Sequence, residues 1–336
     1  MSGAASFTTG STDGCVFPHD RIAFHMSSPA LGISVPETPR ATARRKKFWR
    51  NVGIFLLVAG PNYLVLMVFT YRPMFLSFYY SLLNWNLGSE VAQFIGLGNY
   101  VEWVNDPETP RVLLTTFVYA LFTVVGGMVG GLALALALNR KLVGRGIVRT
   151  VTFAPYVLSG IAVGFLWMYI FNPNIGLLSI MLGWFDVASP EWFTQQPWPL
   201  LMIIIVTLWK HVGYVALIYL AGLQSVPQDL RDAAALDGAG HLRTFSRITL
   251  PLLGPITFFL LVTLTLSALQ SFDLIRAMTN GGPLGSTKTL MFQVYVEGFQ
   301  IGRAGYGSAV ATVLFVVLLA ITVIQMKFVE RRVHYQ

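Results

Sequence analysis

The sequence predicts an all-α integral membrane protein with six transmembrane helices and one further short helix on the cytoplasmic side. Three observations lead to this prediction. Hydrophobic residues make up 54% of the 336 residues and charged residues 11%, whereas a soluble domain has about 25% charged residues. Six stretches of about 20 residues carry almost no charge, which is the length that crosses a bilayer core of roughly 30 Å. The basic residues lie between these stretches and gather on one side of the predicted bilayer.

The elements follow in chain order. Residues 1–48 are predicted to be a disordered cytoplasmic tail, because most of this segment is rich in Ser, Thr, Gly and Pro and has no hydrophobic periodicity. Residues 49–336 are predicted to form the transmembrane domain, with spans at about 51–71, 112–138, 148–171, 200–223, 256–274 and 309–326. The second span contains Gly126, Gly127, Gly130 and Gly131. These glycines predict close packing against a neighbouring helix, because small residues let helix backbones approach each other in lipid.

The distribution of Lys and Arg predicts the orientation. Six spans alternate the loops between two sides, and one side then receives 17 of the 23 basic residues, the other receives 5, and Lys210 lies within a span. Cytoplasmic loops carry the excess of basic residues in membrane proteins. Both termini are therefore predicted to be cytoplasmic.

Several classes of function are disfavoured. The formal charge of +8 does not indicate nucleic-acid binding, because the basic residues flank apolar spans and form no single patch. Cys15 is the only cysteine, so the chain cannot form an intrachain disulfide. We find no His, Asp or Glu cluster with metal-ligand spacing and no Gly-x-x-x-x-Gly-Lys-Ser/Thr phosphate loop. The chain is therefore predicted to have no catalytic residues, no metal site and no bound cofactor of its own.

The loop between the fourth and fifth spans has a distinctive pattern. Ala233, Ala234 and Ala235 favour a helix and leave one of its faces without bulk, so that it could enter a groove on another protein. Gly238 is expected to end this helix or to bend the chain sharply. Pro251 then precedes the next span. We therefore expect a short helix against the inner face of the membrane, joined by a turn to a second segment.

The same loop resembles the signature loop of the permease subunits of bacterial ABC importers. The family pattern is Glu-Ala-Ala, three residues, Gly, nine residues, Ile, one residue, Leu-Pro. This chain has Asp232-Ala233-Ala234, then Gly238, Ile248 and Leu250-Pro251, with Asp in place of Glu. Residues 94–100 and 279–283 are similar to segments of sugar-type permeases, and residues 328–336 are similar to the end of the first permease of the glycerol-3-phosphate type.

This resemblance implies the type I ABC importer permease fold, with the short loop helix acting as a coupling helix. It implies import of a sugar or a glycerol-3-phosphate-like solute across the bacterial inner membrane. The implied partners are a second permease subunit, two ATP-binding cassette subunits that bind the ATP, and an extracytoplasmic solute-binding protein, together with the lipid bilayer. The residues implied to contact an ATPase subunit are Asp232, Ala233, Ala234, Asp237, Gly238, Leu250 and Pro251.

Polar groups within spans are candidates for the solute path, because burying them in a membrane is costly. The candidates are Gln270, Ser271, Asp273, Lys210, Tyr169 and Asn172. Each also has a structural interpretation. Gln270, Ser271 and Asp273 could form hydrogen bonds between helices. Lys210 could pair with a carboxylate or with backbone carbonyls, and Tyr169 and Asn172 could anchor the protein at the membrane interface.

Two alternatives belong to other classes. A stand-alone secondary transporter or channel of six helices would be expected to show internal repeats, broken helices and an ion relay within the membrane, and the sequence shows no such repeat and few acidic residues in its spans. A membrane enzyme would need a cluster of catalytic or metal-binding residues, which the sequence lacks. Purification with or without partner subunits would distinguish the importer from the stand-alone transporter.

Overall fold

The computed structural model describes residues 40–139 and 144–329. The chain divides into two units, Met1–Tyr63 and Leu64–Gln336. Most of the predicted tail lies outside the described residues, but helix α1 begins at Arg40, so residues 40–48 are helical where the prediction placed disorder. The smaller unit holds most of α1, Arg40–Leu66. Many of its apolar side chains are exposed, such as Leu57 at 77%, and exposed apolar surface of this kind requires lipid or another subunit.

The larger unit is helical apart from one short antiparallel strand pair, in which Leu83 faces Phe94. After α1 the helix continues through a π-helical turn, η1 (Met67–Tyr71), into α2 (Arg72–Tyr80). The remaining elements, in order, are β1 (Leu83–Asn84), β2 (Gln93–Phe94), α3 (Gly98–Asn105), α4 (Thr109–Leu138), α5 (Arg145–Val157), α6 (Gly160–Ile170), α7 (Leu177–Gly183), α8 (Trp198–Ser225), α9 (Gln228–Leu236), α10 (His241–Thr244), η2 (Phe245–Thr249), α11 (Leu250–Leu252), α12 (Gly254–Leu269), α13 (Asp273–Met278), α14 (Leu290–Tyr295), η3 (Val296–Gln300) and α15 (Ala304–Val329).

Within the described residues, five helices are long and apolar enough to cross a membrane, and a sixth crossing is possible if one bent helix pair counts as a span. The five are Phe48–Tyr80, Thr109–Leu138, Trp198–Ser225, Gly254–Met278 and Ala304–Lys327. They contain the predicted spans at 51–71, 112–138, 200–223, 256–274 and 309–326.

The predicted third span, 148–171, is not a straight helix. It consists of α5 and α6, whose axes differ by 100°. Pro155 lies in the last turn of α5, and Ser159 has an extended backbone with ψ of 133°. Proline lacks an N–H and clashes with the carbonyl of the preceding turn, so Pro155 weakens the last turn of α5, which ends at Val157. The hydropathy of this segment is continuous, which is why the sequence predicts one span here.

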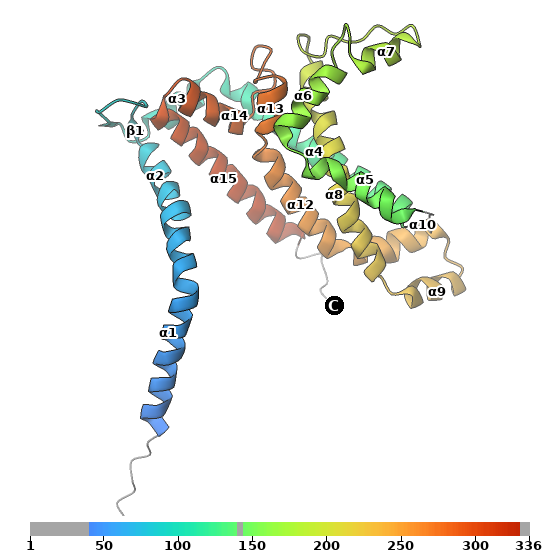
Figure 1. Ribbon diagram of the computed structural model, residues 1–336, viewed down its shortest axis with the longest axis horizontal. Coiled ribbons are helices and arrows are strands. Elements are labelled where there is room, and N and C mark those ends of the chain that lie inside the picture. The colour runs from blue at the N-terminus through green and yellow to red at the C-terminus, as the bar shows by residue number, and fades with distance from the viewer. Residues whose placement is uncertain (1–39, 140–143, 330–336) are drawn as a thin grey trace, which may run out of the picture. The chain divides into compact units, whose positions relative to one another are not determined.

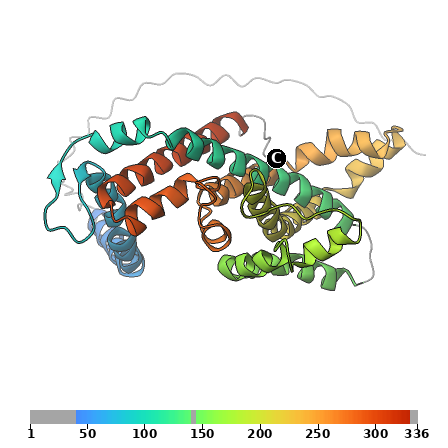
Figure 2. The same ribbon diagram turned by 90° about the horizontal axis from the view of Figure 1, so that it is seen from above.

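Helices α4 and α8 form the centre of the larger unit and run side by side in the same direction (Figure 1, Figure 2). A Cβ added at Gly131 would lie 2.4 Å from Val215 Cγ1, and one added at Gly126 would lie 3.0 Å from Leu208 Cδ2. At Gly131 the overlap would involve the β-branched Val215 close to its backbone, so only glycine permits this approach. The predicted role in close helix packing is therefore confirmed for Gly131, whereas a Cβ at Gly127 would make an ordinary contact of 3.6 Å.

The two halves of the bent segment pack against different helices. Helix α5 lies along α8, where Gly213 faces the Thr152 carbonyl, and Tyr156 stacks on Tyr214 with ring centroids 4.4 Å apart. Helix α6 lies along α13, where Gly164 packs against Ala277. The bend therefore lies between a helix that packs on α8 and a helix that packs on α13.

Candidate functional site

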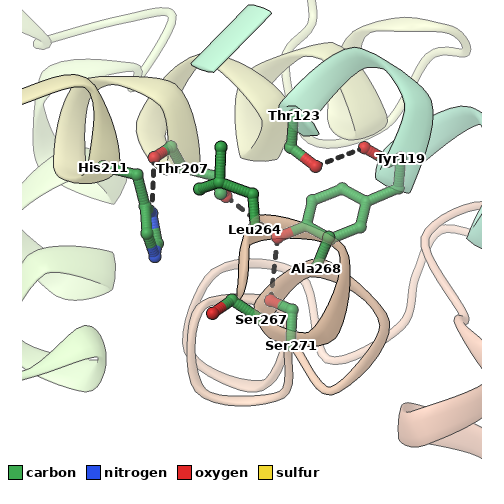
Figure 3. Close-up of a pocket in the computed structure, with 8 residues that line it drawn as sticks. All are labelled: Tyr119, Thr123, Thr207, His211, Leu264, Ser267, Ala268 and Ser271. Atoms are coloured by element: carbon green, nitrogen blue, oxygen red, sulfur yellow. Dashed lines mark hydrogen bonds between the residues drawn. The ribbon is translucent and has the colours of Figure 1, made fainter. Parts of the chain in front are cut away.

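A polar hollow lies between α4, α8 and α12, near the point where α12 ends. It encloses about 290 Å³, including its open mouth. The lining residues come from these helices and the segment after α12: Tyr119, Thr123, Thr207, His211, Leu264, Ser267, Ala268 and Ser271 (Figure 3). Most of these side chains carry a hydroxyl or an imidazole nitrogen, in helices that are otherwise almost wholly apolar.

Tyr119 is at the centre of the hydrogen bonds around this hollow and is fully buried. Its hydroxyl donates to Ser271 Oγ at 2.8 Å and shares a hydrogen bond with Thr207 Oγ1 at 3.1 Å. His211 Nδ1 lies 2.9 Å from the Thr207 carbonyl, and Thr123 Oγ1 donates to the Tyr119 carbonyl at 2.7 Å (Figure 3). The network joins three spans that are up to 152 residues apart.

The local sequence explains why Ser271 can reach this network. Helix α12 ends at Leu269, and α13 begins at Asp273, so Ser271 lies in a short interruption of the span. An interruption at membrane depth is tolerated where the backbone lines a cavity or is buried in protein. The hydroxyls of Ser271 and Ser267 both face the hollow, and within the described chain Ser267 has no hydrogen-bond partner. Such groups can donate to and accept from the hydroxyls of a small polar ligand.

The other predicted residues of span five lie beside the hollow. Gln270 is the C-cap residue of α12 and is exposed. Asp273 begins α13 and packs against Gly160 at the start of α6, where an added Cβ would lie 2.9 Å from Asp273 Cβ. Only Ser271 of the predicted trio lines the hollow itself.

Lys210 is bound to the backbone at the bend between α5 and α6. Its Nζ donates to the Tyr156 carbonyl at 3.2 Å and also to the Leu158 carbonyl. Both carbonyls lie at the end of α5, where the helix no longer supplies a partner. In this structure Lys210 therefore pairs with backbone carbonyls, which was its structural interpretation. It does not line the hollow.

Tyr169 and Asn172 lie apart from the hollow. The Tyr169 side chain is 61% exposed on α6. Asn172 follows α6, and its Oδ1 accepts from the backbone N–H groups of Asn174 and Ile175 at 2.9 and 3.2 Å. Asn172 thus stabilises the turn after α6.

Sequence reasoning missed Tyr119, Thr123, Thr207 and Ser267. A signal was present for two of them, because Thr115, Tyr119 and Thr123 recur at intervals of four residues and so share one face of α4. A polar stripe on an otherwise apolar span is an indication of a site. Thr207 and Ser267 have no comparable pattern and are identified only by their position in the fold.

The predicted loop helix is α9. Asp232 and Ala233 are exposed and Ala234 is buried. Gly238 has φ of +74°, and the Ala239 N–H bonds back to the Ala234 carbonyl at 2.9 Å. A left-handed glycine with such a bond is a common helix C-terminus, so the predicted end of the helix at Gly238 agrees with the backbone.

Helix α9 is tied to the end of α8 and presents apolar side chains outward. Arg231 Nη2 donates to the Leu223 and Val226 carbonyls at 3.2 and 3.0 Å, which connects α9 to the last turn of α8. Leu236 and Leu242 are 90% and 81% exposed. Helices α9 and α10 project beyond the other helices of the larger unit (Figure 1, Figure 2).

The remaining predicted loop residues complete this region. Asp237 is the C-cap residue of α9, and its N–H bonds to the Ala233 carbonyl at 3.0 Å. Leu250 and Pro251 form α11 together with Leu252, directly before α12. The loop therefore connects α8 to α12, two of the three helices that line the polar hollow.

Residues 127–335 match the family model described as "Binding-protein-dependent transport system inner membrane component". The chain is 35% identical over 283 residues to the sn-glycerol-3-phosphate transport system permease protein UgpA of Agrobacterium fabrum, covering 84% of this chain and 96% of that protein. It is 36% identical over 269 residues to the probable ABC transporter permease protein YurN of Bacillus subtilis, covering 79% and 92%.

A solved structure supports the fold. The chain matches a subunit of a bacterial ABC transporter involved in the import of the acidic polysaccharide alginate, with a TM-score of 0.74 and 23% identity, over 85% of this chain and 99% of that chain. The predicted type I importer permease fold is therefore confirmed.

Proposed function

The chain belongs to the family of binding-protein-dependent transport system inner membrane components, and we propose that it carries a glycerol-3-phosphate-like or sugar-like solute across the inner membrane as one of two permease halves. It is a permease subunit of an ABC importer. The choice of solute is supported by the names of its relatives, among them the UgpA proteins of Agrobacterium fabrum and Pectobacterium atrosepticum at 35% and 32% identity. A stand-alone transporter has no comparable support.

The observation that carries the proposal is the projecting helix α9 and its attachment to α8. Exposed Leu236 and Leu242 and the bare face at Ala233 form a surface that suits a groove on another protein. Arg231 connects α9 to α8, and α8 lines the polar hollow. A displacement of α9 would therefore be transmitted to α8, which forms one wall of the proposed solute path.

The proposed partners are those implied by the family. Two ATP-binding cassette subunits bind and hydrolyse ATP, and one of them receives α9 and the turn from Asp237 to Gly238. A second permease subunit covers the apolar faces that remain exposed, such as that of α1. A solute-binding protein delivers the solute on the opposite side of the membrane, with both termini of this chain in the cytoplasm.

The polar hollow is proposed to hold the solute during transport. The Tyr119, Thr207 and Ser271 hydroxyls already bond to one another, so solute hydroxyls can replace these bonds without leaving polar groups unsatisfied. Ser267 adds a free hydroxyl at the same wall. Rocking of α8 would change the width of the polar hollow, because α8 forms one of its walls.

The test replaces Gly238 by Val in the complete importer. A non-glycine residue at φ of +74° costs about 1–2 kcal/mol, and valine is β-branched and stiff. We expect insertion of the chain to be unchanged, and uptake of radiolabelled sn-glycerol-3-phosphate to fall at least severalfold. Solute-stimulated ATP hydrolysis in proteoliposomes should fall with it.

Gly240→Ala is the matched control, because Gly240 lies in the same turn, has φ of −66° and has nothing within 4 Å of an added Cβ. We expect the control to transport normally. If Gly238→Val also transports normally, α9 does not transmit the force. If the purified chain transports the solute without ATPase subunits, the importer function itself is wrong.

A further inference from the structure

A second hollow lies at the N-terminal ends of α4 and α8. It encloses about 610 Å³, including its open mouth. Its lining includes Arg111, Thr115 and Val118 of α4, Gln196 and Pro199 around the start of α8, and Ser286 of the loop after α13. We name this cavity the outer hollow. Its lining includes one cation, two hydroxyls and one side-chain amide, but no acidic residue.

Two hydroxyls of the outer hollow have no hydrogen-bond partner within the described chain. Thr115 is 6% exposed and makes no hydrogen bond there, whereas its neighbours Thr116 and Thr123 both bond back to carbonyls of α4. Ser286 Oγ is buried and is likewise unpaired. Since buried polar groups are nearly always paired, the unpaired Ser286 hydroxyl indicates a ligand in this cavity, and the Thr115 hydroxyl offers a second donor and acceptor to it.

The charges around the outer hollow favour an anion. Arg111 uses one of its five N–H donors, on the Leu284 carbonyl at 3.1 Å. Helices α4 and α8 both begin at this hollow, at Thr109 and Trp198, and a helix N-terminus carries partial positive charge. The nearest acidic side chain in the sequence, Glu108, is paired with Lys288 at 2.8 Å.

The outer hollow is continuous with the polar stripe of α4. Arg111, Thr115, Tyr119 and Thr123 follow at intervals of four residues on this helix. The first two line the outer hollow, and the last two line the polar hollow between α4, α8 and α12. A ligand released from the outer hollow would therefore meet the hydroxyl network directly.

We propose that the outer hollow receives the phosphate group of the solute, held by the Arg111 guanidinium and the Thr115 and Ser286 hydroxyls, before the solute moves to the polar hollow. This inference rests on the proposed function and deepens it, because it assigns an anionic solute to the importer. A guanidinium binds a phosphate through two parallel N–H donors, and two hydroxyls complete the coordination. A neutral sugar would leave the charge of Arg111 without an opposite charge.

The experiment measures the charge preference of a cysteine placed in the outer hollow. Ser286→Cys is made in the complete importer with Cys15→Ser, and its rates of reaction with an anionic and a cationic methanethiosulfonate reagent are compared. We expect the anionic reagent to react at least several times faster relative to Leu284→Cys, which is 88% exposed beside the hollow. Inorganic phosphate and sn-glycerol-3-phosphate should slow the reaction, and glycerol should not. Thr115→Cys replaces Ser286→Cys if that variant fails to assemble.

Arg111→Gln, combined with Ser286→Cys and Cys15→Ser, should abolish the faster reaction of the cysteine with the anionic reagent. It should also abolish the protection of this cysteine by phosphate. Uptake of sn-glycerol-3-phosphate should fall roughly tenfold, the effect of losing one charge-assisted hydrogen bond, and Arg111→Lys should restore part of it. Arg72→Gln, which removes an exposed arginine that lines neither hollow, is the control. An unchanged preference in Arg111→Gln overturns the proposal.

Two further outcomes separate the sources of the phosphate. If phosphatidylglycerol in the nanodisc protects the cysteine and sn-glycerol-3-phosphate does not, the hollow holds a lipid headgroup, and the solute site is overturned. If sn-glycerol-3-phosphate protects the cysteine in phosphatidylcholine nanodiscs, the solute site is supported. If inorganic phosphate protects but the wild-type importer carries no sn-glycerol-3-phosphate, the anion site stands and the proposed solute is wrong.

Discussion

Glu297 is a buried carboxylate in an ionic cluster at the start of α15. It is 7% exposed, with Lys288 Nζ 4.0 Å from Oε1 and Arg303 Nη1 3.7 Å from Oε2. Burial raises the pKa of Glu297, Lys288 and Arg303 lower it, and Asp106 and Glu108 raise it again, so that the net pKa is raised from 4.5. The carboxylate therefore holds its proton more tightly in the folded protein than in the unfolded chain.

This raised pKa predicts a pH-dependent stability. A raised carboxyl pKa contributes stability that is complete below about pH 4.5 and is lost as the pH rises through the folded value. The glutamine of Glu297→Gln cannot ionise. We therefore expect the melting temperature of this variant, relative to that of the wild type, to increase as the pH rises from about 4.5 through the folded pKa. The measurement is thermal unfolding of the purified complex at a series of pH values. Glu90→Gln, at an exposed carboxylate, is the control, and parallel curves for wild type and Glu297→Gln would refute the assignment.

At the scale of elements, the contact between α5 and α8 holds the bent segment in place. It depends on Gly213, because a Cβ there would lie 1.8 Å from the Thr152 carbonyl oxygen. That atom belongs to the backbone, so no side-chain rotation can relieve the overlap. The carbonyls that Lys210 binds, those of Tyr156 and Leu158, lie at the end of the same helix. Moving α5 would therefore also disturb the bend.

We expect Gly213→Ala to destabilise the complex by about 1–3 kcal/mol, the usual cost of overpacking, and to reduce uptake. Thermal unfolding and the yield of assembled complex measure the first effect. The matched control is Gly127→Ala, another glycine within a membrane helix, whose added Cβ would lie at an ordinary 3.6 Å from Leu264 Cδ1. Equal melting temperatures for the two variants would show that α5 is not held at Gly213.

At the scale of the whole molecule, the orientation in the membrane can be tested with two exposed leucines. Leu236 follows the C-terminal end of α8, and Leu284 follows α13, with the span of α12 and α13 between them. They are 90% and 88% exposed. The two positions should therefore lie on opposite sides of the membrane.

In a Cys15→Ser background, a membrane-impermeant thiol reagent should label Leu284→Cys in intact spheroplasts and label Leu236→Cys only after lysis. The reason is the excess of basic residues on the side of Leu236. Both variants should react equally in detergent, which controls for reactivity. The reverse pattern would place the termini outside the cytoplasm.

Much of the fold could be predicted because it depends on local properties. Hydropathy over about 20 residues identifies a span without knowledge of its neighbours. The positive φ of Gly238 and the close packing of Gly131 follow from the one residue type that has no Cβ. The sequence did not predict the bend at Ser159, because a proline such as Pro155 can either kink a helix or end it. The packing of α6 on α13 decides between the two outcomes here.

The amino-acid sequence alone determined the class of the protein, five of its six predicted spans, its charge asymmetry and the turn at Gly238, because each depends on local composition or on neighbours within one or two helical turns. Only the tertiary structure decided which polar groups meet. Tyr119 and Ser271 are 152 residues apart and bond at 2.8 Å, and Lys210 binds carbonyls 52 and 54 residues away. Contacts of this kind depend on how helices pack, because the packing fixes which faces of distant spans lie opposite each other.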